Sequence, residues 1–582
     1  MDDPPSWRTR REAYLHRFHS RRATRARPAT GFAAPPEPRG IGRQSRGRQL
    51  LAGNFLFAGI LTTAPGGSVW NAMGDPDRLH PELHGFGWLD DLAAVGDARA
   101  RLAAQAWTDA WIREAGDGSG PGWAPEVVAR RLIRLISHGA MLTRGAPSDA
   151  TARYFASLGQ QTRFLSSRAG TAAAGVATIE TLSGLIYATC LLRGLDVKPG
   201  PAVAALAKAC RTSIGADGGI PTRNPEELLR VLTLLQWAQT GLGVAKTAPP
   251  PVLTNAAYRI ATALRGLRHA DGGLARFHGG GRGADGALDL ALSLAGPPGP
   301  MRLTPRMGFA RLVAGRTSLI ADAASPPEGA ASAEGHASTL AFELTSGRRQ
   351  LIVNCGAGAA FGPDWRRAGR ATPSHSTLVL AGFSSSRLAP ARRIKGRVVE
   401  ELIDPPEDVQ ARVTRQPDSL RAEMSHDGFR LTHGLTHVRT LEMSLDGRGV
   451  SGEDLLTTLS DTDKAIHDRA AARADLPVAV RFHLHPDVEA QVDLGGAAVS
   501  LTLKSGEIWI FRHDGIASLS LAPSVYLETG RLKPRPAQQV VLTHAALSYA
   551  TRIRWSLTKA QDTPDVIRDL DWPTDETGEE DD

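Results

Sequence analysis

The feature that most constrains the fold of this chain is a change in hydrophobic period near residue 300. Before about residue 295, apolar residues recur three and four positions apart, whereas beyond about residue 305 they alternate in short runs. Segments rich in glycine and proline, at 279–283 and 296–300, separate the two patterns. A period of 3.6 indicates amphipathic helices, and a period of two indicates half-buried strands. The sequence therefore predicts a helical domain followed by an antiparallel β-sandwich.

Six segments of the first half carry the helical pattern clearly. They span residues 124–141, 152–165, 173–192, 201–214, 225–240 and 252–267. Two turns among them share the sequence Asp-Gly-Gly, at Asp217 and Asp271, about one helical hairpin apart. Repeats at such a spacing indicate stacked helix pairs. We therefore expect an incomplete α/α toroid, in which helical hairpins surround a central cleft.

These boundaries divide the chain into four segments, because 582 residues exceed the usual size of one compact domain. Residues 1–49 are rich in Arg and Pro and predict a basic flexible arm, with one short helix near residues 12–19. Residues 50–300 are expected to form the toroid and residues 301–560 the sandwich. Residues 561–582 form an acidic tail that we expect to be disordered.

The charge of the chain narrows the choice of partners only partly. A net charge of +8 attracts polyanions such as nucleic acid, anionic lipid surfaces or acidic polysaccharide. We expect no nucleic-acid partner, because no recognition motif or alternation of aromatic and basic residues is present. The three cysteines have no CxxC spacing and predict no disulfide framework. The oligomeric state stays open, with a dimer as one option.

The beginning of the chain carries no apolar segment typical of a signal peptide. The most apolar early run, residues 50–61, is too short to span a bilayer. From the residues alone we therefore expect a cytoplasmic protein without a transmembrane segment.

Polar side chains mark three consecutive strand ends between residues 334 and 380. His336 precedes the first predicted strand, Asn354 ends the second, and His375 precedes the third. Adjacent antiparallel strands lie about 5 Å apart, so these side chains are expected to converge. Such a cluster suits a metal ion, a proton transfer or a sugar, and a sheet rim with ordinary surface histidines is the alternative. Glu334, two residues before His336, is expected on the same strand face, pointing into the cleft towards Glu226 or Glu227.

Several motifs occur in the order found in one enzyme family. They are Leu83-His84-Gly85-Phe86-Gly87-Trp88-Leu89, Trp123-Ala124-Pro125, Phe342-Glu343, Asn354-Cys355-Gly356, Trp365-Arg366 and Thr372-Pro373-Ser374-His375-Ser376-Thr377. In these the chain resembles the heparinase II/III-like polysaccharide lyases over about residues 50–560. The resemblance implies a toroid and a sandwich with the cleft between them. It also implies a location in the periplasm or cell envelope, in contrast to the expectation above.

The resemblance also implies catalytic roles. In the resembled family, groups from the helical domain and a histidine from the sandwich neutralise a uronate carboxylate, remove the α proton and protonate the leaving sugar. The family's catalytic histidine falls on Glu334 and its tyrosine on Glu227, so Glu334, Glu227 and Glu226 are expected as acid and base. Arg223 and Asn224 are expected to neutralise the carboxylate, with a helix N-cap as the alternative for Asn224.

The remaining candidate residues would hold a metal ion or contact the sugar. The zinc ligands of the family fall on His336, Asn354 and His375. Because a neutral amide is a weaker ligand than a carboxylate, a hydrogen-bonded cluster without metal is the alternative. His84, Trp88 and Arg370 are expected to contact the sugar, although most such tryptophans belong to a core.

The function implied is that of a polysaccharide lyase-like enzyme. It would cleave an acidic, uronic-acid-containing glycan by β-elimination in the cleft between the two domains. The competing interpretation is a catalytically inactive protein of the same fold that binds or scaffolds envelope glycan.

Overall fold

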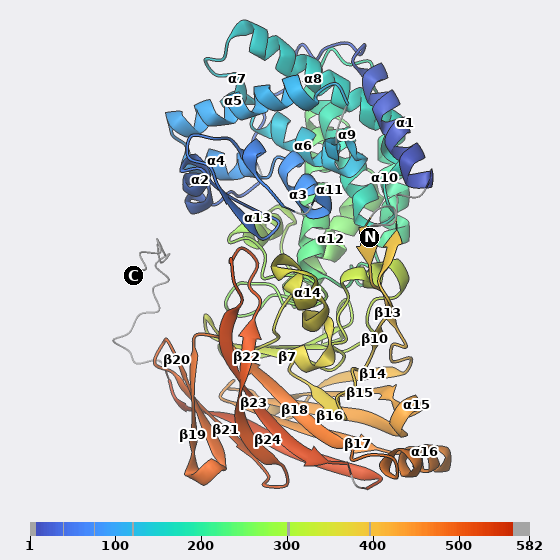
Figure 1. The fold of residues 1–582 in the computed structure, drawn as a ribbon, viewed down its shortest axis with the longest axis vertical. Coiled ribbons are helices and arrows are strands. Elements are labelled where there is room, and N and C mark those ends of the chain that lie inside the picture. Colours follow the sequence, from blue (N-terminus) through green and yellow to red (C-terminus); the bar gives the residue numbers. More distant parts are fainter. Residues whose placement is uncertain are drawn as a thin grey trace.

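A computed structural model describes residues 7–38, 40–74, 76–118, 121–299, 303–394, 397–546 and 548–562. Helices fill one half of the molecule and sheets the other, as Figure 1 shows. The predicted order, an α/α toroid followed by an antiparallel β-sandwich, is confirmed. Most of the acidic tail lies outside the described residues.

The toroid is built from helices that run from α3 to α13. Their bounds are α3 Pro76–His84, α4 Trp88–Val95, α5 Ala98–Ala115, α6 Pro125–Ser137, α7 Gly139–Thr143, α8 Ser148–Arg168, α9 Val176–Leu191, α10 Gly200–Ser213, α11 Pro225–Val244, α12 Pro251–Gly266 and α13 Ala287–Leu294. Proline at the first helical turn opens α6, α11 and α12, where its missing N–H costs no hydrogen bond. All six helical segments expected from the sequence are present.

Helix α9 is the centre of the toroid, with α6, α8, α10 and α11 packed around it. Its sequence is apolar on nearly every side, which is typical of a helix enclosed by others. A Cβ on Gly184 would lie 2.7 Å from the Cβ of Ala129, so glycine allows α9 and α6 to approach closely. The single charged residue of α9 is Glu180, which is 2% exposed. The folding of the toroid therefore places one buried carboxylate among its inner helices.

The first 49 residues differ from the flexible arm that we predicted. Helix α1 (Trp7–Ala23) packs on α8, and Ser20 and Ala23 are buried there. Strand β1 (Gly31–Phe32) pairs with β4 (Leu192–Arg193), and α2 (Gln44–Leu51) packs on α4. Few apolar residues suffice here because the toroid supplies the rest of the core, which composition alone does not reveal.

Short strands also occur in the helical half, where we expected only helices. The apolar run at 50–61 forms most of a hairpin of β2 (Asn54–Phe57) and β3 (Ile60–Thr63). Phe55 and Phe57 point into the core from one face of β2.

The β half contains two large antiparallel sheets. One contains β5 Phe309–Ala314, β6 Thr317–Asp322, β7 Phe342–Ser346, β8 Arg349–Val353, β9 Leu378–Leu380, β18 Pro477–Leu484, β22 Ser518–Tyr526 and β23 Arg535–Ala545. The other contains β14 Val409–Arg415, β15 Ser419–Phe429, β16 Leu435–Ser444, β17 Gly449–Thr457, β19 Val488–Asp493, β20 Ala498–Leu503, β21 Ile508–His513 and β24 Ala550–Gln561. Aromatic residues from both sheets meet in the core, where Phe342 stacks on Trp555.

Smaller elements complete the β half. They are the ribbons β10 Arg387–Leu388 with β13 Leu402–Ile403 and β11 Arg392–Ile394 with β12 Arg397–Val399, and the helices α14 Pro363–Arg370, α15 Arg430–His433 and α16 Asp461–Ala471. None of the helices in the described part of the chain is both long and apolar enough to cross a bilayer.

The two Asp-Gly-Gly turns connect the toroid to the β half. In each turn one carboxylate oxygen accepts the N–H of the second glycine, at 3.0 Å for Asp217 and 2.9 Å for Asp271. The other oxygen reaches across the junction. Asp217 accepts from the backbone N–H of Met307 (2.7 Å), and Asp271 accepts from the side chain of Gln350 (2.9 Å). The repeated turns therefore position the two halves relative to each other.

Candidate functional site

A cavity of about 550 Å³ opens among the inner helices of the toroid. Its walls come from α4, α6, α9, α11 and the beginning of α13. Leu229, Leu234 and Trp237 supply an apolar side, and charged residues supply the rest. A concave site with an apolar wall and a few fixed polar groups is typical of a small-molecule or sugar pocket.

Glu180 lies at the centre of the polar side. Arg130 on α6 forms a bidentate pair with it, at 3.0 and 2.9 Å, and Arg230 on α11 donates to the same carboxylate. Burial alone would raise the pKa of Glu180, but Arg230 and Arg130 outweigh burial and lower its pKa to about 2. Glu180 is therefore a fixed anion that orients both arginines, and it is no proton donor near neutral pH.

A second ion pair completes the charged wall. Asp90 on α4 accepts from Arg134 Nε at 2.8 Å and contacts His138 Nε2 at 2.8 Å. Three arginines thus line the cavity together with four carboxylates, which are Asp90, Glu180, Glu226 and Glu227. Because the charges nearly balance, this cavity does not attract anions through a positive potential.

Three of the predicted catalytic residues lie at the start of α11 and line this cavity. Asn224 is the N-cap of α11, and its side-chain oxygen accepts the N–H of Glu227 at 3.1 Å. Glu226 accepts the backbone N–H of Gly281 at 2.7 Å, and Glu227 accepts a hydrogen bond from the hydroxyl of Thr222. The N-cap alternative for Asn224 is therefore what the structure shows, while its side chain still faces the pocket.

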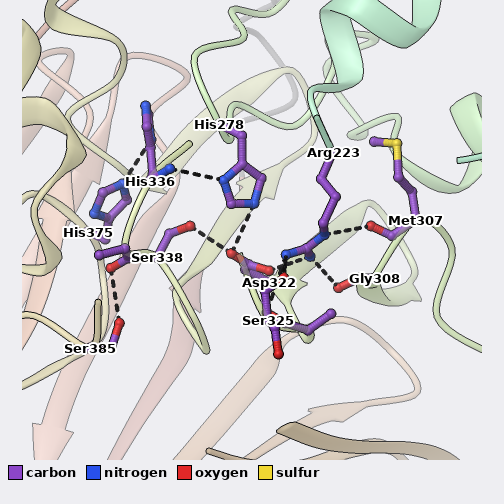
Figure 2. Close-up of polar contacts among 12 residues, drawn as sticks. Arg223, His278, Met307, Gly308, Asp322, Ser325, His336, Ser338, His375 and Ser385 are labelled. Atoms are coloured by element: carbon purple, nitrogen blue, oxygen red, sulfur yellow. Dashed lines mark hydrogen bonds and ion pairs between the residues drawn. The ribbon is translucent and has the colours of Figure 1, made fainter. Parts of the chain in front are cut away.

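Arg223 does not face the cavity, which corrects our expectation that it neutralises a substrate carboxylate. Its guanidinium crosses to the sandwich and pairs with Asp322 at 2.5 Å (Figure 2). It also donates to the backbone carbonyls of Met307, Gly308, Ala324 and Ser325. Each of the five N–H groups of the Arg223 guanidinium thus has an acceptor, and the side chain is a structural clamp between the two halves.

His336 and His375 lie side by side, on the far side of His278 from Arg223 (Figure 2). His375 Nε2 is 3.1 Å from His336 Nδ1, and His336 Nε2 accepts the N–H of Gly279 at 3.1 Å. His336 Nδ1 must therefore carry the proton that it donates to His375, whose own Nδ1–H donates to the carbonyl of Ala371 at 2.9 Å. Burial lowers the pKa of both rings, to about 4 for His375. The pair is neutral and fully hydrogen-bonded.

His278 links this pair to Asp322. Its Nδ1 accepts the backbone N–H of His336 at 3.1 Å, and its Nε2 lies 3.4 Å from Asp322 Oδ2. Ser338 donates to the same oxygen at 2.6 Å. We call Arg223, His278, Asp322, His336 and His375 the seam cluster, because it joins the toroid to the sandwich.

Asn354 is near this cluster but does not share its contacts. Its side-chain oxygen accepts the N–H of Ser376 at 2.9 Å, which leaves the amide NH₂ without a partner. In the described part of the chain no hydrogen bond joins Asn354 to His336 or His375. The structure thus brings the two histidines together and places the amide next to them.

Glu334 does not point towards Glu226 or Glu227 as expected. It ends a 3₁₀ turn, Gly329–Glu334, so strand alternation does not apply to it. Its carboxylate is 55% exposed and pairs with Arg366 at 3.0 Å. The backbone of Gly279, in the loop 279–281, packs beside Glu334 and near Asn224.

The three predicted sugar-contacting residues are structural. Trp88 is 1% exposed and donates to the carbonyl of Leu83, and His84 accepts from Trp111 Nε1 at 2.9 Å. Burial lowers the pKa of His84 to about 3. Arg370 is buried and holds the carbonyls of Ser332 and Gly335. The aromatic side chains at the end of α3 and the start of α4 therefore belong to the core.

The sequence did not predict the central residues of the toroid cavity or the role of His278 in the seam cluster. Glu180, Arg130 and Arg230 belong to three different helices, and no local motif connects them. A single carboxylate in an otherwise apolar helix was the signal available for Glu180. His278 had a signal too, because it directly precedes the glycine run at 279–281.

Comparison with known proteins agrees with this architecture. Residues 296–556 match the family model described as "Heparinase II/III-like, C-terminal". The chain is 32% identical over 548 residues to FtsZ-localized protein C of Caulobacter vibrioides (strain NA1000 / CB15N), and the match covers 92% of this chain and 91% of that protein. The chain belongs to the heparinase II/III-like family.

Solved structures show the same fold. Heparinase III superposes with a TM-score of 0.67 at 12% identity, covering 94% of this chain and 90% of that one. Heparan sulfate lyase HepC from Pedobacter heparinus superposes with a TM-score of 0.54 at 14% identity, covering 96% and 89%. These likenesses establish the heparinase architecture for this chain.

The zinc site implied by the heparinase II/III-like family does not fit the residues present. His336 Nδ1 and His375 Nε2 could face one ion, but Asn354 turns its oxygen to Ser376. Protein zinc sites use at least three protein ligands. Among the described residues, no group of three or more His, Cys, Asp or Glu side chains is arranged to hold a metal ion.

Proposed function

We propose that this chain is a glycan-binding member of the heparinase II/III-like family that acts with the FtsZ division apparatus. The toroid cavity is the proposed glycan site. The observation that carries the proposal is the cavity itself, which combines an apolar wall at Trp237 with arginines and carboxylates held by one another. Such groups donate to and accept from sugar hydroxyls without changing their own protonation.

The charge of the cavity favours a neutral glycan over a uronic-acid polymer. Arg130 and Arg230 are both directed at Glu180, and Arg134 is directed at Asp90. A substrate carboxylate would compete with these carboxylates and meet Glu226 and Glu227 as well. An acidic glycan, which we expected from the resemblance, is therefore the less favoured ligand at this site.

The second candidate function is catalysis by β-elimination. Family membership and the position of Glu226 and Glu227 in the cavity favour it. Against it, no imidazole or phenol is among the residues that line the cavity in the described chain. Of the two glutamates at the family's histidine and tyrosine positions, Glu334 pairs with Arg366 at the surface. Of that pair only Glu227 lines the cavity, together with its neighbour Glu226.

One experiment separates the two functions. The purified protein is incubated with neutral glycans and with uronic-acid polymers, and binding is measured by titration calorimetry while the absorbance of unsaturated product is followed. We expect binding of a neutral glycan without a rise in absorbance. Arg230→Gln should weaken that binding at least tenfold, about 1.4 kcal/mol. Arg113→Gln, at a surface position of α5 that is 63% exposed, is the matched control and should change nothing.

An absorbance rise that Glu227→Gln abolishes would instead establish the lyase. The FtsZ part of the proposal rests on the name of the Caulobacter relative and is tested separately. A fluorescent fusion of this chain should gather at the division site and disperse when FtsZ is depleted. A fusion that keeps its position without FtsZ would overturn this part while leaving the glycan site untouched.

A further inference from the structure

A second cavity, of about 210 Å³, lies where the Asp271 turn meets the sandwich. Six arginines and one lysine line it, and the carboxylates present are Asp271, Asp487 and Glu528. Unlike the toroid cavity, it therefore carries an excess of positive charge. Walls of low dielectric constant focus such a potential into the cavity.

Arg276 is the central residue of this cavity. Its side chain comes from the toroid half, is 9% exposed, and lines the cavity. Its direct side-chain partners are neutral: Nη1 donates to Gln350 Oε1 at 2.6 Å, and the guanidinium lies 5.4 Å from the centre of the Tyr526 ring. Within the described chain no carboxylate forms an ion pair with it. Burial alone would lower the pKa of Arg276, but Tyr526, Glu343, Asp271 and Glu528 outweigh burial and raise it, so its guanidinium is a charged donor at the wall of the cavity.

The surrounding groups hold Arg276 in place. Gln350 accepts from Arg276 and from the hydroxyl of Tyr526 (3.3 Å), and its NH₂ donates to Asp271 at 2.9 Å. The orientation of the Gln350 amide is thus fixed by partners on both sides. The backbone N–H of Arg276 donates to Glu343 at 3.0 Å, which anchors the main chain. The guanidinium is therefore preorganised towards the cavity.

The carboxylates at the rim are already paired. Asp487 contacts Arg535 at 2.8 Å and Lys504 at 3.3 Å, and Glu528 contacts Arg531 at 3.3 Å. They orient the outer cations without reaching Arg276. The inner part of the cavity is left with a forked donor, an aromatic face and a cationic rim, which is the combination that binds oxyanions.

We propose that this cavity, which we call the seam anion site, binds an oxyanion carried on a small sugar-sized molecule. A phosphate, a sulfate or a carboxylate offers the shared chemistry, with two or three acceptor oxygens for Arg276 and the rim. The site is distinct from the toroid cavity and does not depend on the glycan function proposed above. It would give the protein a charged ligand at the junction of its two halves.

The acidic tail of this chain is the competing occupant. Gln561 pairs with Ile508, in the hairpin that carries Lys504, so the described part of the chain ends near this cavity. A full-length variant in which every Asp and Glu from 563 to 582 is replaced by Asn or Gln removes that competition. It distinguishes an external anion from the tail.

The test uses full-length protein and calorimetry at low ionic strength, with inorganic phosphate, sulfate, glucose 6-phosphate and glucuronate as separate probes. We expect saturable binding of at least one probe. Arg276→Gln should weaken it tenfold or more, and Lys504→Gln, at the rim, two- to fivefold. Lys464→Gln, on α16 and 45% exposed, is the matched control and should leave it unchanged.

The outcomes are distinct. Preference for glucose 6-phosphate over inorganic phosphate would identify a phosphorylated sugar as the source, and preference for glucuronate a uronate. If Arg276→Gln fails to fold, the difference between Lys504→Gln and Lys464→Gln carries the test. The proposal is overturned if no probe binds, if the two lysine variants weaken binding equally, or if binding occurs only in the variant with the neutral tail.

Discussion

Two buried aspartates of this protein each pair with one arginine and one histidine, but they lie in different parts of the molecule. Asp322, in the seam cluster, pairs with Arg223 and faces His278. Asp454 on β17 pairs with Arg439 at 2.7 Å and with His437 at 2.8 Å. Burial alone would raise the pKa of both carboxyls, but the arginine and the histidine outweigh burial and lower the pKa of each below its usual range.

The difference lies in where the partners come from. Arg439 is the direct cross-strand neighbour of Asp454, so the sheet register alone brings the pair together. Arg223 and His278 come from the toroid, and they reach Asp322 only when the toroid docks on the sandwich. The same triad of arginine, aspartate and histidine therefore stabilises one domain in the first case and the association of two domains in the second.

Removing the charge from either aspartate should have the largest effect and should separate these roles. Asp322→Asn and Asp454→Asn each leave a buried arginine without its counter-ion, and we expect each to cost about 3–5 kcal/mol of unfolding free energy. In scanning calorimetry, Asp454→Asn should lower the melting temperature of the sandwich. Asp322→Asn should instead split the unfolding into two transitions, because the domains lose the buried ion pair that joins them. A single transition at the unchanged temperature for Asp322→Asn would contradict the seam role.

Truncation of one histidine of the seam cluster should cost less. His336→Ala leaves the N–H of Gly279 and His375 Nε2 without partners, and we expect a loss of about 1–3 kcal/mol. His336→Gln offers one acceptor and one donor and should recover part of it. Added zinc should leave the melting temperature of the wild type unchanged. A zinc-dependent rise in the wild type that His336→Ala abolishes would show that the histidines do hold a metal.

Low pH should destabilise the seam cluster and the group around Asp454 in the same way. Burial lowers the pKa of His336 and His375 at the seam and of His426 and His437 beside Asp454. Unfolded histidines titrate near 6.5, so their contribution to stability is full above that pH. It falls as the pH drops towards about 4, the folded pKa of His375. At pH 5.5 His375 should cost about 1.4 kcal/mol of stability, and the lowered pKa values of the other three histidines act in the same direction.

Substitution identifies which cluster carries that dependence. His336→Gln should flatten the pH dependence of domain association, and His426→Gln that of the sandwich, as measured by urea unfolding between pH 5 and pH 8. An unchanged slope in both variants would place the titration elsewhere.

The smallest effect is expected at Glu334, outside both clusters. Its ion pair with Arg366 is half exposed, so Glu334→Gln should change the unfolding free energy by less than about 1 kcal/mol. It should also leave glycan binding unaltered. A large loss of binding would return Glu334 to the site where the resemblance placed it.

The parts of this molecule that sequence reasoning predicted are those fixed by local patterns. Hydrophobic period located the toroid helices and the sandwich, and the Asn224-Pro225 pair at the start of α11 indicated the cap at Asn224. The convergence of His336 and His375 followed from consecutive strand ends. The destinations of Arg223 and Arg276 could not be predicted, because each depends on how the toroid docks on the sandwich. A single sequence contains no local signal for that geometry.

The paired Asp-Gly-Gly turns have a mechanical consequence. A single contact between two domains allows rotation in every direction, whereas two contacts allow rotation only about the line that joins them. Asp217 and Asp271 make two such contacts, each reaching a different segment of the β half. The tip of the β2–β3 hairpin adds a further contact to these and to those of the seam cluster, because Gly59 fits closely against the carbonyl of Ala360. A partner that binds the toroid and fixes its orientation would therefore also fix the orientation of the sandwich at the far end of the molecule.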